Sequence, residues 1–398
     1  MRPRILFLGH SAALSGAELF LTGMLARARD LDPVVLLFED GPLVAHLRSL
    51  GVETSVCPMP RTLDSVSQAG WGEADALAVV RRLPGFARRL HRAVRDSGAV
   101  ALHTNSAKAH VVTAAVARPA RLPVAMHVHD RIAVDSYGRA NRVALHASAA
   151  AARTVLVNSE TTRASLRPRE HRRAHVVPCP VEVHPLPPGQ AGRAVRSGRT
   201  DAVSVALVGR VSPWKGQHEA IRAVAAAAAA PTPVRVDLHL YGAPLFERDQ
   251  EYAREARALA ERLGVADRVH EHGHVSDVTT AMRSHDVVLH ASTRPEPFGQ
   301  VLVEAMAAGL PVLAADRGGP SELLAHGTSG WLYRLGDVEA MTRGLLTLAA
   351  DPALRDRLAA AAHVRAADFS YDRVLPRWER ILLATAGATG AAPAPDGR

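Results

Sequence analysis

The sequence predicts two doubly wound α/β domains, and three observations support that fold class. Strand patterns alternate with helix patterns, the strands are apolar throughout, and a segment rich in Pro and Gly separates two such series. The alternation indicates parallel sheets with right-handed crossovers. Continuous apolar strands are typical of strands buried on both faces of a sheet. A chain of 398 residues has room for two such domains.

The first series opens with an apolar run at 4–8 that ends at Gly9. A polar loop follows, and a helix is predicted from Gly16 to Arg29. Further strands of this series are predicted at 34–38, 53–57, 100–103, 124–129 and 154–158. In doubly wound sheets, ligands bind beyond the carboxyl ends of the strands. We therefore expect functional side chains in the loops that follow these runs.

A second series of strands begins after residues 184–200, which have no hydrophobic period and are typical of a linker. Its strands are predicted at 204–208, 237–241, 269–272, 286–290 and 311–314. We expect the following division of the chain: an N-terminal domain over 1–183, the linker over 184–200, a C-terminal domain over 201–365, C-terminal helices over 366–384 with a return to the N-terminal domain as one option, and a disordered tail over 385–398.

The composition argues against several protein classes. Two cysteines, Cys57 and Cys179, are too few for a disulfide framework and favour a reducing compartment. The apolar run at the N-terminus is too short for a signal peptide. No apolar run reaches the length of about 18 residues that a membrane-spanning helix needs. We therefore expect a cytoplasmic protein. The abundance of Ala and Arg suggests a GC-rich bacterial genome.

The net charge of +9 is concentrated in the first half, where residues 1–198 hold 26 Lys and Arg against 15 Asp and Glu. Nucleic acid, an anionic membrane surface or an acidic substrate could each account for this charge. The stretch 81–95 predicts an amphipathic helix that either packs on the core or lies peripherally on the inner face of the membrane. No helix-turn-helix or aromatic-interleaved basic patch is present, so nucleic acid is not expected.

The most informative motif runs from Glu296 to Val312. Gly299 stands where a loop becomes a helix predicted over Gln300–Ala308, and a helix N-terminus offers free N–H groups and positive potential. One of the two carboxylates, Glu296 or Glu304, can then hold sugar hydroxyls while the other accepts hydrogen bonds from a ribose diol. The alternative is that both are solvated surface acids.

A second motif, from Gly209 to Gly216, directly follows the strand 204–208. Arg210 and Lys215 can clamp a pyrophosphate, since Arg offers a bidentate fork and Lys a compact charge. Their charge would also stabilise a nucleoside diphosphate as it leaves. The alternative is a pair of surface cations on a turn.

Two weaker motifs belong to the first domain. In the loop from Gly9 to Glu18, Gly16 allows close approach of a phosphate or sugar. At the end of the strand 124–129, alternation places His127 and His129 on one face, next to Asp130. Zinc would need a third ligand at typical spacing, which is not evident. A core histidine and a plain strand-to-helix turn remain the alternatives.

These motifs resemble the family 4, or group 1, retaining glycosyltransferases, which have the GT-B fold. Glu296–Val312 contains the family's E-x-F-G and E-A-M-A-x-G-x-P-V hallmark, and Gly209–Gly216 is similar to its G-R-x-x-x-x-K-G segment. The first loop is similar to one that ends in G-G-A-E, with Ser15 in place of a glycine. Cys179-Pro180 departs from the family's P-N-G-V-D. The resemblance implies two Rossmann-like domains that face each other across a cleft.

The resemblance also implies a hexosyltransferase-type reaction, in which a sugar moves with retention from a UDP- or GDP-sugar to an acceptor hydroxyl. The implied catalytic residues are Glu296, His129, Arg210 and Lys215. The implied donor-binding residues are Gly16, Gly209, Arg210, Lys215, His274, Val275, Glu296, Phe298, Gly299, Gln300 and Glu304. Two cations suffice for the diphosphate, so no cofactor and no metal are expected.

The acceptor stays open at this point: it is a glycan, a lipid-linked molecule or a small molecule, in cell-envelope glycan or natural-product biosynthesis. A nucleotide-sugar epimerase on the same fold is the main alternative function. A basic nucleic-acid-binding protein is less favoured.

Overall fold

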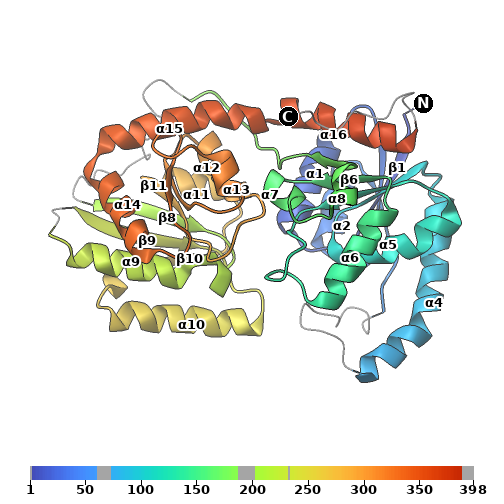
Figure 1. Ribbon diagram of the computed structural model, residues 1–398, viewed down its shortest axis with the longest axis horizontal. Helices are drawn as coiled ribbons and strands as arrows, with labels where there is room; N and C mark the ends of the chain where they lie inside the picture. Colours follow the sequence, from blue (N-terminus) through green and yellow to red (C-terminus); the bar gives the residue numbers. More distant parts are fainter. Residues whose placement is uncertain (1, 61–72, 187–201, 232–233, 388–398) are drawn as a thin grey trace. The chain divides into compact units, whose positions relative to one another are not determined.

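The computed structural model describes residues 2–60, 73–186, 202–231 and 234–387, which form two compact units (Figure 1). The first comprises Met1–Pro180 together with Tyr371–Arg398, and the second comprises Val181–Ser370. The linker expected over 184–200 falls largely outside the described residues. The first unit therefore takes its last helix from the end of the chain.

The first unit is built on a parallel sheet of seven strands in the order β3-β2-β1-β4-β5-β6-β7. The strands are β1 (Arg4–Gly9), β2 (Asp32–Leu37), β3 (Glu53–Val56), β4 (Ala101–Thr104), β5 (Val124–Val128), β6 (Thr154–Val157) and β7 (Ala174–Val176). The helices are α1 (Gly16–Arg27), α2 (Pro42–Ser49), α4 (Glu73–Asp96), α5 (Ala107–Ala120), α6 (Arg139–Ala151), α7 (Glu160–Arg163), α8 (Pro168–His171) and α16 (Tyr371–Ala386).

The C-terminal helix α16 is part of the core of the first unit. Trp378 is fully buried, and its ring stacks on Phe7 of β1 with 5.7 Å between the centroids. Thr385 is also buried and donates a hydrogen bond of 2.8 Å to Thr154 at the start of β6. The expectation of a disordered tail from 385 is therefore wrong for Thr385 and Ala386, which belong to α16. Residues 388–398 lie outside the described part of the chain.

The basic amphipathic stretch lies in α4, and its apolar face packs on the sheet. Phe86, Leu90 and Val94 are each at most 1 % exposed and belong to one core cluster with residues of β1, β2 and β4. The Arg side chains at 88, 92 and 95 are exposed. The apolar side chains of this helix that the structure describes are thus occupied by the core, as the core-packing alternative predicts.

The second unit is built on a parallel sheet of six strands in the order β10-β9-β8-β11-β12-β13. The strands are β8 (Ala202–Val208), β9 (Arg235–Tyr241), β10 (Val269–Gly273), β11 (Val287–His290), β12 (Val312–Ala315) and β13 (Trp331–Tyr333). The helices are η1 (Pro213–Lys215), α9 (Gln217–Ala229), α10 (Glu247–Arg262), η2 (Ala266–Arg268), α11 (Val278–Arg283), α12 (Gln300–Ala307), α13 (Gly319–Leu323), α14 (Val338–Ala350), α15 (Pro352–Ala366) and η3 (Ala367–Phe369).

Helices cover both faces of the second sheet (Figure 1). The odd-numbered side chains of β8, such as Val205 and Leu207, pack against α9 and α14 in a large apolar cluster. On the other face, α12 contributes the fully buried Leu302 and Met306. The predicted fold class of two doubly wound α/β units is confirmed. Both sheets are parallel, and in each the first strand of the unit, β1 or β8, lies in the interior of the strand order.

Candidate functional site

Loops at the carboxyl ends of the second unit's strands are held together by glycines. A Cβ at Gly216 would lie 1.8 Å from the carbonyl oxygen of Ala291, which follows β11. A Cβ at Gly318 would lie 2.2 Å from the carbonyl oxygen of Glu296, and one at Gly319 would lie 1.8 Å from that of Phe298. No real side chain tolerates such distances, so glycine is required where these backbones meet. The loops after β8, β11 and β12 thus converge on Glu296.

The carboxylate of Glu296 is the centre of this convergence. Its Oε2 accepts hydrogen bonds of 3.0 Å from Nζ of Lys215, 3.0 Å from Nε2 of His290 and 2.9 Å from Oγ of Ser292. Glu296 is 7 % exposed. Lys215 also places its ammonium 3.8 Å from the centre of the Trp214 ring. The structure therefore brings together Glu296 and Lys215, which the sequence motifs predict to act together.

The electrostatics of Glu296 follow from these partners. Burial alone would raise the pKa of this carboxyl, but the Lys215 ammonium and the hydrogen bond from His290 outweigh burial and lower the pKa well below its usual range. The carboxylate is therefore ionised at any physiological pH. A buried, ionised carboxylate with fixed orientation is suited to accept hydrogen bonds from sugar hydroxyls.

The second carboxylate of the motif, Glu304, lies on α12, one turn in from the helix start. Gly299 is the N-cap of that helix with a φ of 99°, and Gln300 is its first residue. Gln300 Nε2 donates a hydrogen bond of 3.2 Å to Glu304 Oε1. Burial raises the pKa of Glu304 to about 7, although the Gln300 hydrogen bond lowers it in part. Unlike Glu296, this carboxyl has no cationic partner among the described residues.

Arg210 is directed toward α10 and not toward Glu296. Its Nε lies 3.9 Å from Oδ2 of Asp249, and its guanidinium lies 5.4 Å from the centre of the Phe246 ring. Gly209 before it has a φ of 151°, and a Cβ at Gly242 would lie 2.0 Å from its carbonyl oxygen. The structure thus gives Arg210 and Lys215 different acidic partners, Asp249 and Glu296.

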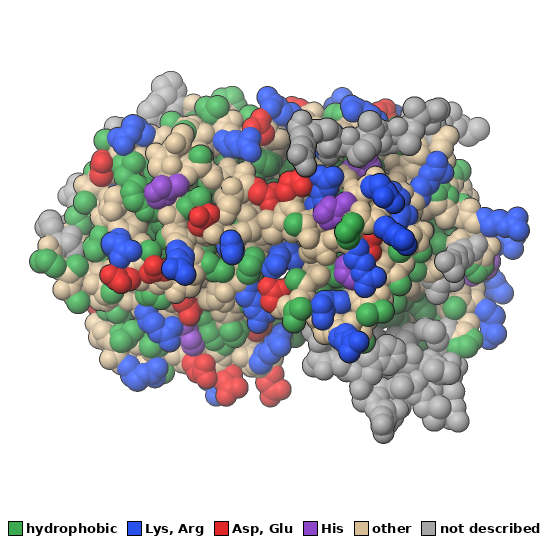
Figure 2. Space-filling model, viewed as in Figure 1, with side chains coloured by type: hydrophobic (Ala, Val, Ile, Leu, Met, Phe, Trp, Pro, Cys, Tyr) green, Lys and Arg blue, Asp and Glu red, His purple; other side chains and the backbone are tan. Residues whose placement is uncertain are grey.

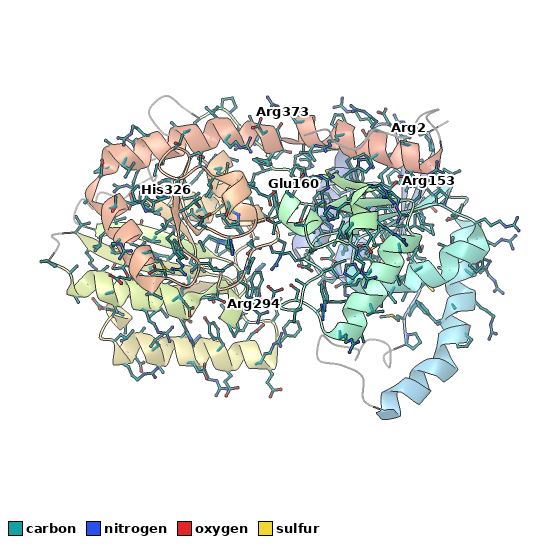
Figure 3. The ribbon with its side chains drawn as sticks, viewed as in Figure 1. Arg2, Arg153, Glu160, Arg294, His326 and Arg373 are labelled. Atoms are coloured by element: carbon teal, nitrogen blue, oxygen red, sulfur yellow. The ribbon has the colours of Figure 1, made fainter. Side chains whose placement is uncertain are left out.

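The other donor-side residues predicted from sequence have less direct links to Glu296. The side chain of Phe298 is 4 % exposed and packs edge-on against Phe369, so only its backbone is available to a ligand. His274 and Val275 lie in the loop after β10, where His274 is exposed. In the described residues no hydrogen bond or ring contact joins either of them to the Glu296 network. Arg294, labelled in Figure 3, lies in the same loop as Glu296.

In the first unit, Asn105 connects the two residues that the sequence singles out. Its Oδ1 lies 2.8 Å from Nε2 of His129, and its Nδ2 donates 2.8 Å to the carbonyl of Ala17, next to Gly16. Because the amide must donate through Nδ2, Oδ1 is the acceptor, which assigns the proton of His129 to Nε2. A Cβ at Gly16 would meet nothing within 4 Å, so the protein's own packing does not require glycine there.

His129 is a neutral imidazole at physiological pH. Burial lowers its pKa to about 4. Its ring stacks on that of His127, with 4.3 Å between centroids, as strand alternation predicts. His127 itself is fully buried, so it is a core histidine and not an accessible ligand. Across the described residues, no group of three or more His, Cys, Asp or Glu side chains is arranged to hold a metal ion.

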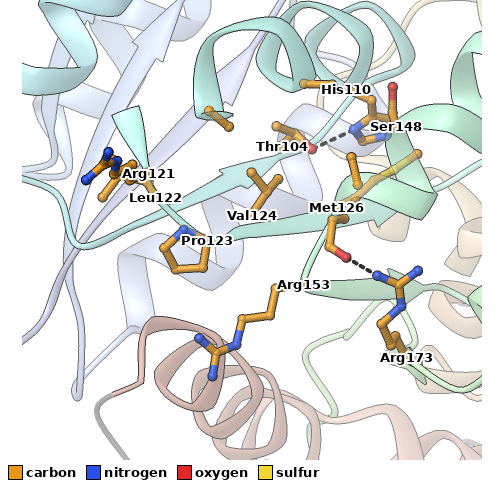
Figure 4. Close-up of a pocket in the computed structure, with 14 residues that line it drawn as sticks. Thr104, His110, Arg121, Leu122, Pro123, Val124, Met126, Ser148, Arg153 and Arg173 are labelled. Carbon is orange, nitrogen blue, oxygen red and sulfur yellow. Dashed lines mark hydrogen bonds between the residues drawn. The ribbon is translucent and has the colours of Figure 1, made fainter. Parts of the chain in front are cut away.

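The first unit also contains a cavity of about 290 Å³ (Figure 4). Pro123, Arg153 and Arg173 line it, and each directly precedes one of the strands β5, β6 and β7. Arg173 donates a hydrogen bond of 2.6 Å to the carbonyl of Ala152. The cavity therefore reaches the amino ends of these strands, and its lining also includes Thr104 at the carboxyl end of β4.

Sequence reasoning missed His290, Ser292, Asp249 and Asn105. Two of them, His290 and Ser292, lie only six and four residues before Glu296, so their spacing was a usable signal.

The charge asymmetry of the sequence is visible on the surface: in Figure 2 the visible face of the first unit carries mainly Lys and Arg, and most acidic side chains lie over the second unit. No helix in the described ranges is long and apolar enough to cross a bilayer.

Comparison with known protein families gives two matches that together span most of the chain. Residues 195–365 match the family described as glycosyl transferases group 1. Residues 21–182 match the family described as glycosyl transferase 4-like domain. The first match contains the Glu296 network, and the second contains Asn105 and His129.

Relatives of known function match part of the chain. A lipopolysaccharide core biosynthesis glycosyltransferase of Rhizobium meliloti is 31 % identical over 191 residues, which is 48 % of this chain and 52 % of that protein. A D-inositol 3-phosphate glycosyltransferase of Acidothermus cellulolyticus is 34 % identical over 243 residues, 59 % of this chain and 54 % of that protein. The matched region thus spans about half the length of these relatives.

Solved structures match nearly the whole chain. The Anabaena protein HepE, crystallised with UDP and glucose, superposes with a TM-score of 0.78 at 28 % identity and covers 95 % of this chain and 98 % of its own. The same protein was also solved with UDP-glucose. Sucrose-phosphate synthase from Thermosynechococcus elongatus has a TM-score of 0.78 at 20 % identity, which shows the shared fold, with 98 % of this chain and 100 % of that one covered.

Proposed function

The chain belongs to the group 1 glycosyltransferases of family 4, which have the GT-B fold, and we propose that it transfers a sugar from a nucleoside diphosphate sugar to an acceptor hydroxyl with retention of configuration. One observation carries this proposal: an ionised, buried carboxylate, a lysine ammonium and a helix N-terminus meet at the carboxyl ends of one parallel sheet. Ligands of such sheets bind at this edge.

Each of these groups suits one part of the donor. Lys215 and the positive N-terminal end of α12 supply positive charge for the diphosphate. Glu296 accepts hydrogen bonds from the sugar, and Glu304 accepts them from the ribose. When the bond to the sugar breaks, negative charge grows on the departing phosphate, and Lys215 stabilises it. Arg210 would turn from Asp249 to join it, and the buried Asp249 would keep Arg248, whose Nε lies 4.0 Å from Oδ1.

The donor we propose first is a UDP-sugar, because HepE was crystallised with UDP and UDP-glucose at 28 % identity. A GDP-sugar remains the second choice. The two cations make a divalent metal unnecessary for the diphosphate, so we propose metal-independent transfer. In the first unit, His129 and Gly16 would approach the reacting sugar and the acceptor, with His129 positioning a hydroxyl as a neutral ring.

For the pathway we propose cell-envelope glycan synthesis in the bacterial cytoplasm. The Rhizobium meliloti relative carries a name from lipopolysaccharide core biosynthesis. The exposed Arg side chains of α4 are suited to peripheral contact with anionic lipid on the inner face of the membrane. A lipid-linked acceptor would then be within reach, and this contact requires no apolar insertion.

A thermal-shift and turnover experiment tests the proposed function. Purified protein is mixed with UDP-glucose, UDP-N-acetylglucosamine and GDP-mannose, each with EDTA, and the release of free nucleoside diphosphate is followed. We expect one donor to raise the melting temperature and to be turned over slowly by water. Glu296→Gln keeps the shape but removes the charge, and should lower turnover by about a hundredfold or more. Full turnover by Glu296→Gln would refute the assignment.

A further inference from the structure

The hydrogen bonds around Glu296 all reach the same oxygen. Lys215, His290 and Ser292 converge on Oε2, and no described residue donates to Oε1. Oε1 is therefore the atom through which this carboxylate can accept a hydrogen bond from a ligand. The orientation of Oε1 depends on how firmly Oε2 is held.

Lys215 cannot hold Oε2 by itself during the reaction. A diphosphate attracts the same ammonium that donates a hydrogen bond to Glu296. His290 and Ser292 differ from Lys215, because both are buried residues next to the carboxylate. His290 is the last residue of β11 and is 6 % exposed, and Ser292 is 2 % exposed. They also contact each other, with 3.1 Å between Ser292 Oγ and His290 Nε2.

The surroundings of His290 fix which ring nitrogen carries the proton. Nδ1 is buried and has no hydrogen-bond partner among the described residues. A proton on Nδ1 would leave a buried N–H without an acceptor and would turn the bare lone pair of Nε2 toward the ionised carboxylate. A proton on Nε2 avoids both costs, so the proton belongs on Nε2, which faces Glu296 Oε2. The hydroxyl of Tyr333 donates a hydrogen bond of 3.3 Å to the backbone carbonyl of His290, which fixes the end of the strand.

We propose that His290, assisted by Ser292, is the positioning residue that keeps Glu296 aimed at the donor sugar when the diphosphate draws Lys215 away. This inference rests on the proposed function, because it assigns a role in sugar binding to residues that the sequence motifs did not include. His290 does not touch the sugar and acts only through Glu296. Its loss should weaken recognition of the sugar and leave recognition of the nucleoside diphosphate unchanged.

Two substitutions of His290 separate the role of its Nε2 from the mere presence of a polar side chain. In His290→Gln, the amide nitrogen can reach the position of Nε2 and still donate to Glu296. In His290→Asn, the amide nitrogen lies near the position of Nδ1 and cannot. His285→Asn is the matched control: His285 is 4 % exposed in the same unit, and its ring Nε2 lies 2.8 Å from Tyr241 OH, away from Glu296.

The measurement is calorimetric binding of UDP and UDP-glucose to the full-length protein, with UDP release giving kcat and KM. If the wild-type protein prefers GDP, then GDP and GDP-mannose replace them. We expect His290→Asn to weaken UDP-glucose binding and to lower kcat by about tenfold to a hundredfold, with UDP binding unchanged within about twofold. His290→Gln and His285→Asn should stay within about threefold of the wild type for both ligands.

Ser292→Ala provides a second test if His290→Asn does not fold. It removes one donor to Oε2 and little volume, and should weaken UDP-glucose binding but not UDP binding. Equal losses of UDP and UDP-glucose binding, or equal losses in His290→Asn and His290→Gln, would overturn the positioning role. Wild-type protein that binds none of these nucleotides or nucleotide sugars would instead show that the proposed function itself is wrong.

Discussion

At the scale of single residues, the two glutamates of one motif have opposite electrostatic situations. Glu296 is ionised because a lysine and a histidine face it, whereas Glu304 has only a neutral amide as its partner. Burial raises the pKa of Glu304 to about 7. A ribose diol donates two hydrogen bonds, which a carboxylate can accept and a protonated carboxyl accepts less well. Glu304 therefore makes donor binding depend on pH near neutrality.

The affinity for UDP-glucose should rise about tenfold between pH 6 and pH 8. The ligand binds the ionised form of Glu304, so binding releases a proton and strengthens as the pH rises through the pKa of about 7. UDP-glucose is a suitable probe because its diphosphate is a diester and does not titrate in this range. Glu304→Gln should bind more weakly at pH 8 and lose the pH dependence. The same slope in both proteins would contradict the assignment.

The sequence predicted part of this site for a physical reason. Glu296, Gly299 and Lys215 lie in loops whose residue types are constrained by backbone contact and charge, so their pattern is visible in one chain. His290 and Ser292 escaped attention because one ends an apolar strand and the other resembles an ordinary loop serine. The contact between Arg210 and Asp249 joins residues 39 positions apart, which no local pattern reveals.

At the scale of elements, the long strands and helices followed from apolar periodicity, and the short ones did not. The strands β7 and β13 have three residues each, too few for a pattern to stand out. They form because parallel neighbours, β6 and β12, present unpaired backbone groups to them. The glycines predicted the loops. They did not predict the backbone contacts that make glycine necessary at those positions.

The glycines of these loops give a matched test of that reasoning. Gly216 and Gly327 have nearly the same φ, 74° and 71°. A Cβ at Gly216 would lie 1.8 Å from a backbone oxygen, whereas at Gly327 it would meet nothing within 4 Å. Gly327→Ala should cost about 1 kcal/mol for the left-handed backbone alone. Gly216→Ala should cost at least about 2 kcal/mol more, measured by urea unfolding. Equal losses of unfolding free energy in the two variants would show that the loop shifts to accommodate the methyl group at little cost.

At the scale of the whole molecule, the sequence predicted two α/β units but left the place of the last helix open. Apolar periodicity shows that α16 buries one face, and it does not show which sheet receives that face. The answer depends on contacts far apart in sequence: Glu379 Oε1 accepts hydrogen bonds from the backbone N–H groups of Arg29 and Asp30, at 2.7 and 2.8 Å. Such contacts assign the end of the chain to the first unit.

Both units also bury clusters of neutral histidines, which should make folding sensitive to acid. In the first unit, burial lowers the pKa of His103, His110, His127 and His129, and in the second unit it lowers those of His239, His272 and His285. The folded chain binds fewer protons than the unfolded chain wherever a histidine pKa is depressed. Stability is therefore fully present above the unfolded pKa of about 6.5 and is lost as the pH falls toward 4.

One substitution in the first unit isolates this effect. His103 is fully buried beside Phe7 and Trp378, and both its ring nitrogens lack partners within the described residues. His103→Phe keeps an aromatic ring there and removes one titrating group. Between pH 6.5 and pH 5 the free energy of unfolding should fall less steeply than in the wild type, by about 1.1 kcal/mol per pH unit on average, because the unfolded histidine is about half protonated at pH 6.5 and almost fully protonated at pH 5.

Hydrogen exchange of peptides from β1 and β4 measures the stability of the first unit without contribution from the second. His46→Gln, at an exposed position of α2, serves as the control and should keep the wild-type slope. If His103→Phe also keeps that slope, the ring of His103 is reached by water or protons in the folded state, and the acid sensitivity of the first unit must come from elsewhere. A reduced slope confined to His103→Phe would instead show that the buried histidines of the first unit determine the pH range in which it is stable.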